Sequence, residues 1–214
     1  MRKLPACLFI CLLACLFSCS EDKVVYDIGE YKVDLATVRI KNNEQFFLLD
    51  SEISLLNREI IKNLNDGQRV LLNYSYLSET VSGYDHVIKV NNASLVILDK
   101  LSAVNSVTID TIANDPIRLE SIWIGNKYLN ISFYMNYNSQ KHSISLITDK
   151  SKTDEESINI YFRHNNNNDA PGYLRRVIAS FDLSEILVKP DSDRILITHV
   201  YSDNYGEKEY RFRY

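Results

Sequence analysis

The stretch LNISFYMNY, residues 129–137, decides the fold class of this 214-residue chain. Its side chains alternate in character along the stretch, as they do on the two faces of a β-strand. One face carries Leu129, Ile131, Phe133, Met135 and Tyr137, and the other carries Asn130, Ser132, Tyr134 and Asn136. One apolar and one polar side is typical of an antiparallel sheet that buries a single face. The stretch therefore predicts a strand in a β-protein.

Segments with the same period of two lie on both sides of this stretch and predict a C-terminal half built from strands. The expected strands are residues 117–124, 128–137, 142–148, 157–164, 175–183, 194–202 and 207–214. Seven short strands at this spacing favour a β-sandwich, because two antiparallel sheets can each bury one face. The Asn-rich segment 165–172 is expected to be the most prominent loop between them.

The N-terminal half alternates in the same way, and its expected strands are residues 31–40, 45–50, 68–77, 84–91 and 94–99. Within the first of these the apolar positions change parity after Leu35, which indicates a β-bulge or a sharp bend. Five strands with a bent first strand are compatible with a small OB-type barrel. The expected helix, residues 55–64, falls between the second and third strands, whereas the OB fold has its helix after the third. Either one strand is misassigned or the barrel is atypical.

The strand pattern fades near residue 100, and small and polar residues are more frequent in the stretch that follows. We therefore predict an all-β chain with a small OB-like barrel followed by a β-sandwich. The predicted regions are a lipoprotein signal peptide at 1–18, a tether at 19–28, a barrel domain at 29–101, a linker at 102–115 and a sandwich domain at 116–214.

A charged and then apolar N-terminus precedes the predicted domains. Arg2 and Lys3 are followed by a mostly apolar run at 4–17 and by Ser18, which correspond to the n-region, h-region and cleavage site of a signal peptide. As a helix this run would reach about 21 Å at about 1.5 Å per residue, less than the roughly 30 Å hydrocarbon core of a bilayer. The sequence thus predicts a removable signal peptide rather than a retained transmembrane helix.

All four cysteines lie within the first nineteen residues, which is not how a disulfide framework is distributed. Cys19 best fits the lipoprotein pattern, because Leu16 stands three residues before it and Ser18 immediately before it. The flanks of Cys15 also fit locally, but cleavage there would leave Leu16 near the new terminus. We predict that Cys19 is lipidated. Two or more acyl chains would anchor it firmly, since a single chain at about 0.8 kcal/mol per CH₂ binds only marginally.

The mature chain would carry a net negative charge. Without Arg2 and Lys3 it has 22 Lys and Arg residues against 28 Asp and Glu residues, a formal net charge of −6. An acidic protein repels phosphate backbones, so nucleic acid is not an expected partner. The expected location is the cell envelope, anchored in the outer membrane and facing the periplasm or the cell surface. The tether segment 20–23 is interpreted either as a surface-export signal or as a solvated linker.

Signatures of catalysis, metal binding and nucleotide binding are absent from the sequence. The histidines are scattered, at 86, 142, 164 and 199, and no Cys follows position 19, so no local zinc motif can be written. The six glycines never fall two apart, which excludes a dinucleotide-binding loop. We therefore predict no catalytic residue, no metal ligand and no cofactor, and we interpret His199 as a satisfied, half-buried imidazole in a strand.

One candidate modification site lies in the predicted linker. The segment Asp110-Thr111-Ile112 matches the three-residue O-glycosylation sequon of Bacteroides-like secreted proteins. An exposed linker would tolerate a sugar at this position. Thr111 is therefore a candidate glycosylation site, and an ordinary linker threonine is the alternative interpretation.

Three motifs, together with the lipoprotein signal, give the chain a family resemblance. They are Asp27-Ile28-Gly29-Glu30-Tyr31, then Leu64-Asn65-Asp66-Gly67-Gln68-Arg69-Val70 followed by Leu72-Asn73-Tyr74, and Tyr161-Phe162-Arg163-His164-Asn165. With them the mature chain resembles the NigD-like lipoproteins of Bacteroides-type bacteria over essentially its whole length. The resemblance implies an N-terminal OB-like barrel, a C-terminal β-sandwich and an association with a bacteriocin gene cluster. It carries over no functional residue.

These observations lead to two hypotheses about function. The first is a non-enzymatic binding or interaction module of the cell envelope, with a protein or glycan partner and with the membrane contacted through lipidated Cys19. An accessory or immunity role beside a bacteriocin is one version of it. The alternative is a glycan or peptide hydrolase in which carboxylates and histidines meet in a site between the two domains.

Overall fold

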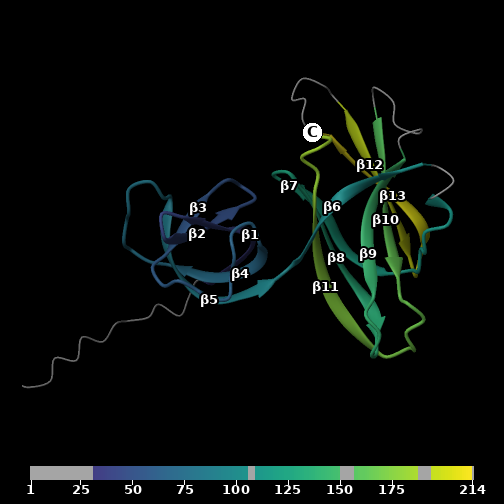
Figure 1. The fold of residues 1–214 in the computed structure, drawn as a ribbon, viewed down its shortest axis with the longest axis horizontal. Helices are drawn as coiled ribbons and strands as arrows, with labels where there is room; N and C mark the ends of the chain where they lie inside the picture. Colours follow the sequence, from purple (N-terminus) through teal and green to yellow (C-terminus); the bar gives the residue numbers. More distant parts are fainter. Residues whose placement is uncertain (1–30, 106–108, 150–156, 188–193, 214) are drawn as a thin grey trace, which may run out of the picture. The chain divides into compact units, whose positions relative to one another are not determined.

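The computed structural model describes residues 31–105, 109–149, 157–187 and 194–213. The predicted signal peptide and the whole predicted tether, which includes Cys19, lie outside these ranges, while Tyr31–Tyr214 forms one compact unit. Apart from one helical position at Ile109, the elements named within the described ranges are strands, as Figure 1 shows, which confirms the all-β class. In the same ranges, no helix is both long and apolar enough to cross a bilayer.

The first five strands close into a barrel. They are β1 (Tyr31–Lys41), β2 (Glu44–Leu49), β3 (Ser54–Asn57), β4 (Arg69–Tyr76) and β5 (His86–Leu95), in the order β1-β2-β3-β5-β4. The long strand β1 pairs with β4 through its first part and with β2 through its second part, which closes the barrel. The register of β1 is continuous with both neighbours. Its change of apolar parity therefore reflects burial on both faces at Leu35–Val38 rather than a bulge.

The predicted helix at 55–64 is wrong, and its first residues form the short strand β3. Leu55, Leu56 and Asn57 are all buried, because β3 lies between β2 and β5 in the barrel. The predicted strand at 94–99 is also wrong: Leu95 ends β5, and a new strand begins at Ile97. The misfit with the OB fold thus came from one missed strand and one misassigned strand. The barrel itself has the five strands of an OB fold.

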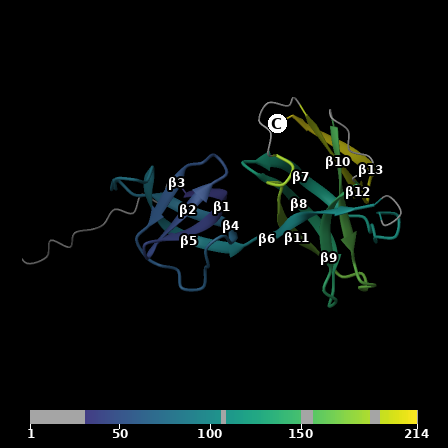
Figure 2. The same ribbon diagram turned by 45° about the horizontal axis from the view of Figure 1, so that its top comes forward.

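The remaining strands build the sandwich. They are β6 (Ile97–Val104), β7 (Arg118–Gly125), β8 (Tyr128–Tyr137), β9 (Ser143–Asp149), β10 (Ser157–Asn165), β11 (Tyr173–Asp182), β12 (Ile195–Ser202) and β13 (Gly206–Arg213). Their order in the sheet is β13-β12-β10-β9-β6-β11-β8-β7. Figure 2 shows β6 leading from β5 into this layer. Because β6 pairs first with β11 and then with β9, this single strand joins the set β11-β8-β7 to the set β9-β10-β12-β13.

This pairing bears on the predicted domain bounds of 29–101, 102–115 and 116–214. Residues 97–100 pair with β11, and residues 101–104 pair with β9, so the start of the predicted linker lies inside a sandwich strand. The last hydrogen bond back to the barrel in this stretch runs from the Val96 amide to the Arg69 carbonyl, at 2.9 Å. We propose that the boundary between barrel and sandwich lies at Val96.

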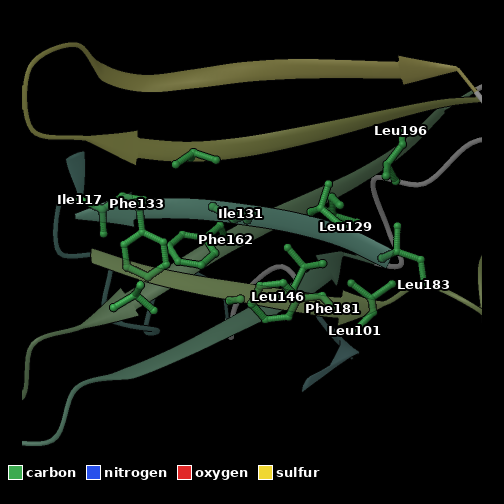
Figure 3. Packing of buried hydrophobic residues seen from close by; sticks show 14 of the residues in the cluster. Leu101, Ile117, Leu129, Ile131, Phe133, Leu146, Phe162, Phe181, Leu183 and Leu196 are labelled. Carbon is green, nitrogen blue, oxygen red and sulfur yellow. The ribbon is translucent and has the colours of Figure 1, made fainter. Parts of the chain in front are cut away.

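The sandwich core forms around β8, the strand predicted from LNISFYMNY. Figure 3 shows Leu129, Ile131 and Phe133 packed against Phe162 and Phe181 from β10 and β11. The Phe133 and Phe162 rings meet edge to face, with 5.3 Å between centroids. The polar face of β8 differs from its prediction, because Asn130 and Ser132 are buried as well. The first part of the polar side of this strand is therefore covered by other side chains, whereas Tyr134 is half-buried and Asn136 faces water as predicted.

Candidate functional site

The motif segment 64–70 forms a tight turn that positions Arg69 at the start of β4. Gly67 has φ 81°, a left-handed conformation that glycine adopts without steric cost. The turn is fixed to β1, because the Gly67 amide donates to the Val38 carbonyl at 2.8 Å and the Ile40 amide donates to Asp66 Oδ1 at 2.8 Å. The local sequence thus fixes the backbone position of Arg69, and with it the point on the barrel from which this side chain extends.

Arg69 is the centre of a buried polar cluster. Its side chain is fully buried, and its guanidinium binds both carboxylate oxygens of Asp50, at 2.7 and 2.9 Å. Arg69 also donates to three side chains from β1, β8 and β11, which are Thr37, Asn130 and Ser180. We call these five residues the junction network, because Thr37, Asp50 and Arg69 belong to the barrel and Asn130 and Ser180 belong to the sandwich.

Other polar groups of the junction network also have hydrogen-bond partners, in addition to the Arg69–Asp50 ion pair. Asn130 donates to Asp50 Oδ2 at 3.1 Å, and Ser180 donates to Asn130 Oδ1 at 2.7 Å. The Arg69 guanidinium also lies 4.2 Å from the centroid of the Tyr128 ring, a cation–π geometry. A buried ion pair is tolerated only when its remaining hydrogen-bonding groups have partners, and these contacts provide them. The network therefore fixes the two parts of the chain to each other.

Two grooves adjoin Asp50. The larger has a volume of about 400 Å³, and we call it the Trp123 groove. Its lining includes Val33, Asp34, Leu71, Trp123, Arg176 and Ile178. The smaller, of about 210 Å³, is lined in part by Arg39, Lys127 and Asp182. Both grooves combine apolar walls with a few charged groups, which is the composition of small-ligand and peptide sites.

The charged side chains around the Trp123 groove already have protein partners. Arg176 pairs with Glu120 at 2.6 Å, and Glu120 also accepts hydrogen bonds from Ser132 at 2.5 Å and from Tyr134 at 3.2 Å. These bonds, first that from Ser132 and then that from Arg176, lower the pKa of Glu120. Glu120 is therefore held as an ionised acceptor, and Arg176 is held in place beside it.

The two carboxylates that line this groove, Asp34 and Asp50, do not form a free catalytic pair. Both oxygens of Asp50 accept hydrogen bonds from Arg69. Asp34 accepts a bond from the Tyr74 hydroxyl at 3.1 Å, and burial, with the neighbouring Tyr76 and Asp34, raises the pKa of Tyr74, which keeps it a donor. Glycoside hydrolysis needs a carboxylate that can protonate, attack or take up a proton. Asp50 is not available for such a step.

The structure brings together two of the four histidines and separates the others. His142 and His164 lie in contact at the end of the sandwich, with 2.9 Å between Nδ1 of the first and Nε2 of the second. His199 is half-buried, stacks on the Tyr161 ring and bonds Asn159 at 2.9 Å, as its sequence position indicated. His86 is exposed on β5. Within the described residues, no group of three or more His, Cys, Asp or Glu side chains could hold a metal ion.

Of the two site residues predicted from sequence, one lies in the described part of the chain. Cys19 is outside it. Thr111 is exposed, in a segment whose buried Ile109 and half-buried Ile112 pack on Ile147. Its glycosylation stays a prediction. Sequence reasoning missed the junction network and the histidine contact, although the motifs containing Arg69 and His164 were both part of the family resemblance.

Comparison with known proteins gives a consistent result at the level of the fold. A search of curated proteins found no match. Among solved structures, the chain is similar to a protein of unknown function from Bacteroides vulgatus, with 26% identity and a TM-score of 0.77, over 86% of this chain and 91% of that chain. It is also similar to a NigD-like immunity protein from Bacteroides caccae, with 20% identity and a TM-score of 0.62, over 86% and 97%.

A third similar structure is a Bacteroides fragilis protein provisionally described as a lipoprotein, with 11% identity, a TM-score of 0.67 and coverage of 86% of this chain and 98% of that chain. Identities this low show a shared fold alone. The family models are more specific: the NigD-like N-terminal OB domain matches residues 35–96, and the NigD-like C-terminal beta sandwich domain matches residues 100–214. Because the second match alone spans more than half of the sequence, this chain belongs to the NigD-like family.

Proposed function

We propose that this chain is a lipid-anchored protein of the outer membrane whose folded part is a non-enzymatic binding module, displayed on the periplasmic face or on the cell surface. The signal-peptide pattern that ends at Cys19 supports the anchor, and so does the description of the Bacteroides fragilis structure as a lipoprotein. The acidic mature chain argues against nucleic acid as a partner. The partner is a protein or a glycan, and the membrane is reached through the lipidated N-terminus.

The observation that carries the proposal is the Trp123 groove. It offers the indole of the chain's only tryptophan, apolar walls from Val33, Leu71 and Ile178, and the paired guanidinium of Arg176. Tryptophan and arginine are the side chains most enriched at binding hot spots. Because the ion pairs around the groove hold its charged groups in place, the surface is preorganised, which lowers the entropic cost of binding.

The alternative, a glycan or peptide hydrolase with its site between the two domains, is not favoured. Asp50 is tied to Arg69, and the histidines that do meet, His142 and His164, lie at the end of the sandwich and not in the groove. An accessory or immunity role beside a bacteriocin is one specific version of the binding proposal. It is supported by the description of the Bacteroides caccae structure as a NigD-like immunity protein.

The glycosylation predicted at Thr111 is consistent with a secreted protein of the cell envelope. Thr111 is exposed, so an enzyme that adds a sugar to folded or unfolded protein could reach its side chain. We therefore propose O-glycosylation at Thr111. Intact-mass measurement of the protein from its native host, before and after Thr111→Val, tests it: a mass difference larger than the substitution supports the sugar, and no excess mass excludes it.

The binding proposal is tested by site-specific photo-crosslinking in intact cells. A photoreactive amino acid placed at position 123 is expected to give a crosslinked product with one partner, whereas the same group at Tyr205 is not. Tyr205 is a suitable control, because it is 70% exposed and lies in the turn between β12 and β13, none of whose residues lines the groove. Equal crosslinking at both positions, or none at position 123, would overturn the assignment of the groove.

The anchor has its own test, which is independent of the groove. Cys19→Ala is expected to release the protein from the membrane fraction, because the acyl chains can no longer be attached. Ser18→Gly keeps a small residue before the cysteine and is expected to leave the protein in the membrane fraction. Membrane association that survives Cys19→Ala would contradict lipidation at this residue.

A further inference from the structure

The Asn-rich loop at 165–172 has a defined conformation that explains its composition. Asn167 and Asn168 have φ of 54° and 57°, the left-handed region that asparagine tolerates better than most residues. The side chains of Asn165 and Asn166 each accept a hydrogen bond from the amide two residues later, at 2.8 and 2.9 Å. Such Asx turns fold the loop locally. Two of the four asparagines thus adopt the left-handed conformation, and the other two accept hydrogen bonds from the backbone.

Asp169 attaches this loop to the turn between β8 and β9. Its side chain is only 1% exposed and accepts backbone N–H bonds from Asn138, Ser139 and Gln140, at 2.7, 3.1 and 3.1 Å. Burial opposes ionisation of Asp169, but these bonds and His142 outweigh it and lower its pKa to about 2. At Gly172 the loop approaches the Tyr137 backbone so closely that a Cβ would overlap it. Asp169 is therefore a buried anion in a closely packed contact.

Three polar contacts run from Asp169 through the two histidines. His142 Nε2 lies 3.3 Å from Asp169 Oδ2, and His142 Nδ1 lies 2.9 Å from His164 Nε2. His164 Nδ1 lies 3.3 Å from the carbonyl oxygen of Asp115. Both imidazoles are nearly inaccessible to solvent, with the His142 side chain 2% exposed and His164 3% exposed. We call Asp169, His142, His164 and Asp115 the histidine network.

The number of hydrogens that these contacts require is larger than two neutral imidazoles supply. An ionised carboxylate and a carbonyl only accept, so both outer ring nitrogens must carry a hydrogen, and a third hydrogen must lie between the rings. Two neutral imidazoles bring two hydrogens. We propose that the His142–His164 pair binds one extra proton in the folded protein, and that this proton latches the 165–172 loop to the β8–β9 turn.

The surroundings decide where the extra proton lies. Burial lowers the pKa of His164, and the neighbouring His142 lowers it further, although the Asp115 and Pro116 backbones oppose this. His164 is therefore the neutral ring, with its hydrogen on Nδ1 facing the Asp115 carbonyl. His142 is then the imidazolium, donating through Nε2 to Asp169 and through Nδ1 to His164. In this arrangement all three contacts are hydrogen bonds, and the buried charge of Asp169 has a counter-charge.

The other charged and titratable groups around the pair belong to four residues. The Asp115 carboxylate accepts the Asn166 amide at 2.8 Å, and its negative charge favours a proton on the pair. Lys141, which precedes His142, is exposed. The Tyr137 ring lies 5.7 Å from the His142 ring, with the Arg175 guanidinium 4.8 Å from the same tyrosine. The two carboxylates of Asp169 and Asp115 thus favour the extra proton on the pair.

An exposed aromatic surface lies beside the histidine network, because Tyr137 contacts the His142 ring. Tyr137 contacts the Tyr173 ring at 5.8 Å, and Tyr173 and Leu174 are 61% and 48% exposed. When the extra proton is lost, one of the three contacts between Asp169, His142, His164 and the Asp115 carbonyl joins two acceptors. That contact is no longer a hydrogen bond, so the attachment of the loop is weaker. A rise in pH therefore loosens the loop and the aromatic surface beside it. This inference does not depend on the proposed function or on the Trp123 groove.

The proposal is tested by nitrogen NMR of the mature chain, ¹⁵N-labelled at histidine. Near neutral pH we expect hydrogens on both ring nitrogens of His142 and on Nδ1 alone of His164. The matched variants are Asp169→Asn, which is expected to shift the titration of the pair to lower pH, and His86→Gln, which removes an exposed histidine of the barrel and is expected to leave both rings unchanged. Two neutral rings in the unmodified protein at neutral pH would overturn the proposal, whatever the variants do.

Amide hydrogen exchange tests the latch separately from the proton. After correction for intrinsic rates, protection of the Asn138, Ser139 and Gln140 amides is expected to fall at least several-fold as the pair loses its proton. Protection of the Val70 and Leu72 amides in the barrel is expected to stay constant over the same pH range. If the proton leaves and the three amides keep their protection, the pair titrates without acting as a latch, and that part of the proposal is wrong.

Discussion

The junction network and the histidine network are both buried and each contains an aspartate, but the two are chemically different. In the first, the counter-ion of Asp50 is the Arg69 guanidinium, which stays charged at every pH that the protein meets. In the second, the group that we propose as counter-ion of Asp169 is the His142 imidazole, and histidine is the side chain that proteins use as a switch near physiological pH. The comparison shows that one fold can fix one contact permanently and make another depend on a single proton.

The position of each network fits its chemistry. Asp50 and Arg69 connect strands of the barrel to β8 and β11 of the sandwich, so their loss would affect both parts of the chain. Asp169 connects only a loop to a neighbouring turn, so its loss would affect one end of the sandwich. We therefore expect substitutions in the first network to change global stability at all pH values, and substitutions in the second to act locally and with pH.

The largest effect is expected for Arg69→Met. The substitution leaves the Asp50 carboxylate without its counter-ion, and it removes the hydrogen bonds that Arg69 donates to Asn130 and Ser180. We expect the free energy of unfolding to fall by about 3 to 5 kcal/mol. Urea denaturation measures the loss. Arg39→Met is the matched control, because its ion pair with Asp66 is about half exposed on both sides and contributes no more than about 1 kcal/mol. Equal losses in the two variants would show that the buried network is not special.

The second effect concerns a glycine beside each network, where the chain makes a close approach. A Cβ at Gly172 would overlap the Tyr137 backbone, and one at Gly125 would overlap the Asp50 side chain. We expect Gly172→Ala to lower the unfolding free energy by about 1 to 3 kcal/mol, because a backbone neighbour cannot move aside. Gly125→Ala is expected to lower it as well, through displacement of Asp50 from Arg69. Gly83→Ala is the control for backbone strain without overlap, since Gly83 has φ 92° and open space around it.

A smaller effect is expected at Asn168. Its left-handed backbone, with φ 57°, costs about 1 kcal/mol for an alanine. Asn168→Ala is therefore expected to lower the thermal midpoint slightly, whereas Asn168→Gly, which adopts this conformation without steric cost, is expected to keep it unchanged. Calorimetry of the two variants decides the matter. A loss in the glycine variant as large as in the alanine variant would point to the side chain rather than the backbone.

The smallest effect is expected for the surface pair beside the junction network. Lys127 bonds Asp182 at 2.6 Å, and this bond raises the pKa of Lys127 against the opposing effect of burial. Because the lysine side chain is 44% exposed, solvent screens the pair, and Lys127→Met should cost less than about 1 kcal/mol. Repeating the denaturation in high salt should reduce even this difference. A cost that salt leaves unchanged would indicate lost packing on Tyr128 instead.

The fold could be predicted from the sequence wherever a strand has a regular alternating pattern. The stretch 129–137 is the clearest case, and β8 spans Tyr128–Tyr137. The short strand β3 was missed, because its last three residues are all buried between two neighbouring strands and show no alternation. Strand β6 was misplaced for a related reason: its two halves pair with different strands, so neither half has a complete pattern of its own.

The two networks could not be predicted, because each depends on residues that are far apart in the sequence. Arg69 and Asn130 are 61 positions apart, and His142 and His164 are 22 positions apart. Only the turn that positions Arg69 had a local signal, the Asn65-Asp66-Gly67 segment with its left-handed glycine. The polar residues on β8 predicted a solvated face. Asn130 is instead buried, because its partners Asp50 and Ser180 arrive from distant strands.

One measurement tests the difference between the two networks most directly: the unfolding free energy of the unmodified chain, Arg69→Met and Asp169→Asn from about pH 6 to about pH 9, around the ordinary histidine pKa. A proton bound more tightly in the folded than in the unfolded chain contributes stability at low pH that is lost as pH rises. The account therefore predicts that the deficit of Asp169→Asn shrinks as pH rises while that of Arg69→Met stays constant. Two deficits with the same dependence on pH would contradict it.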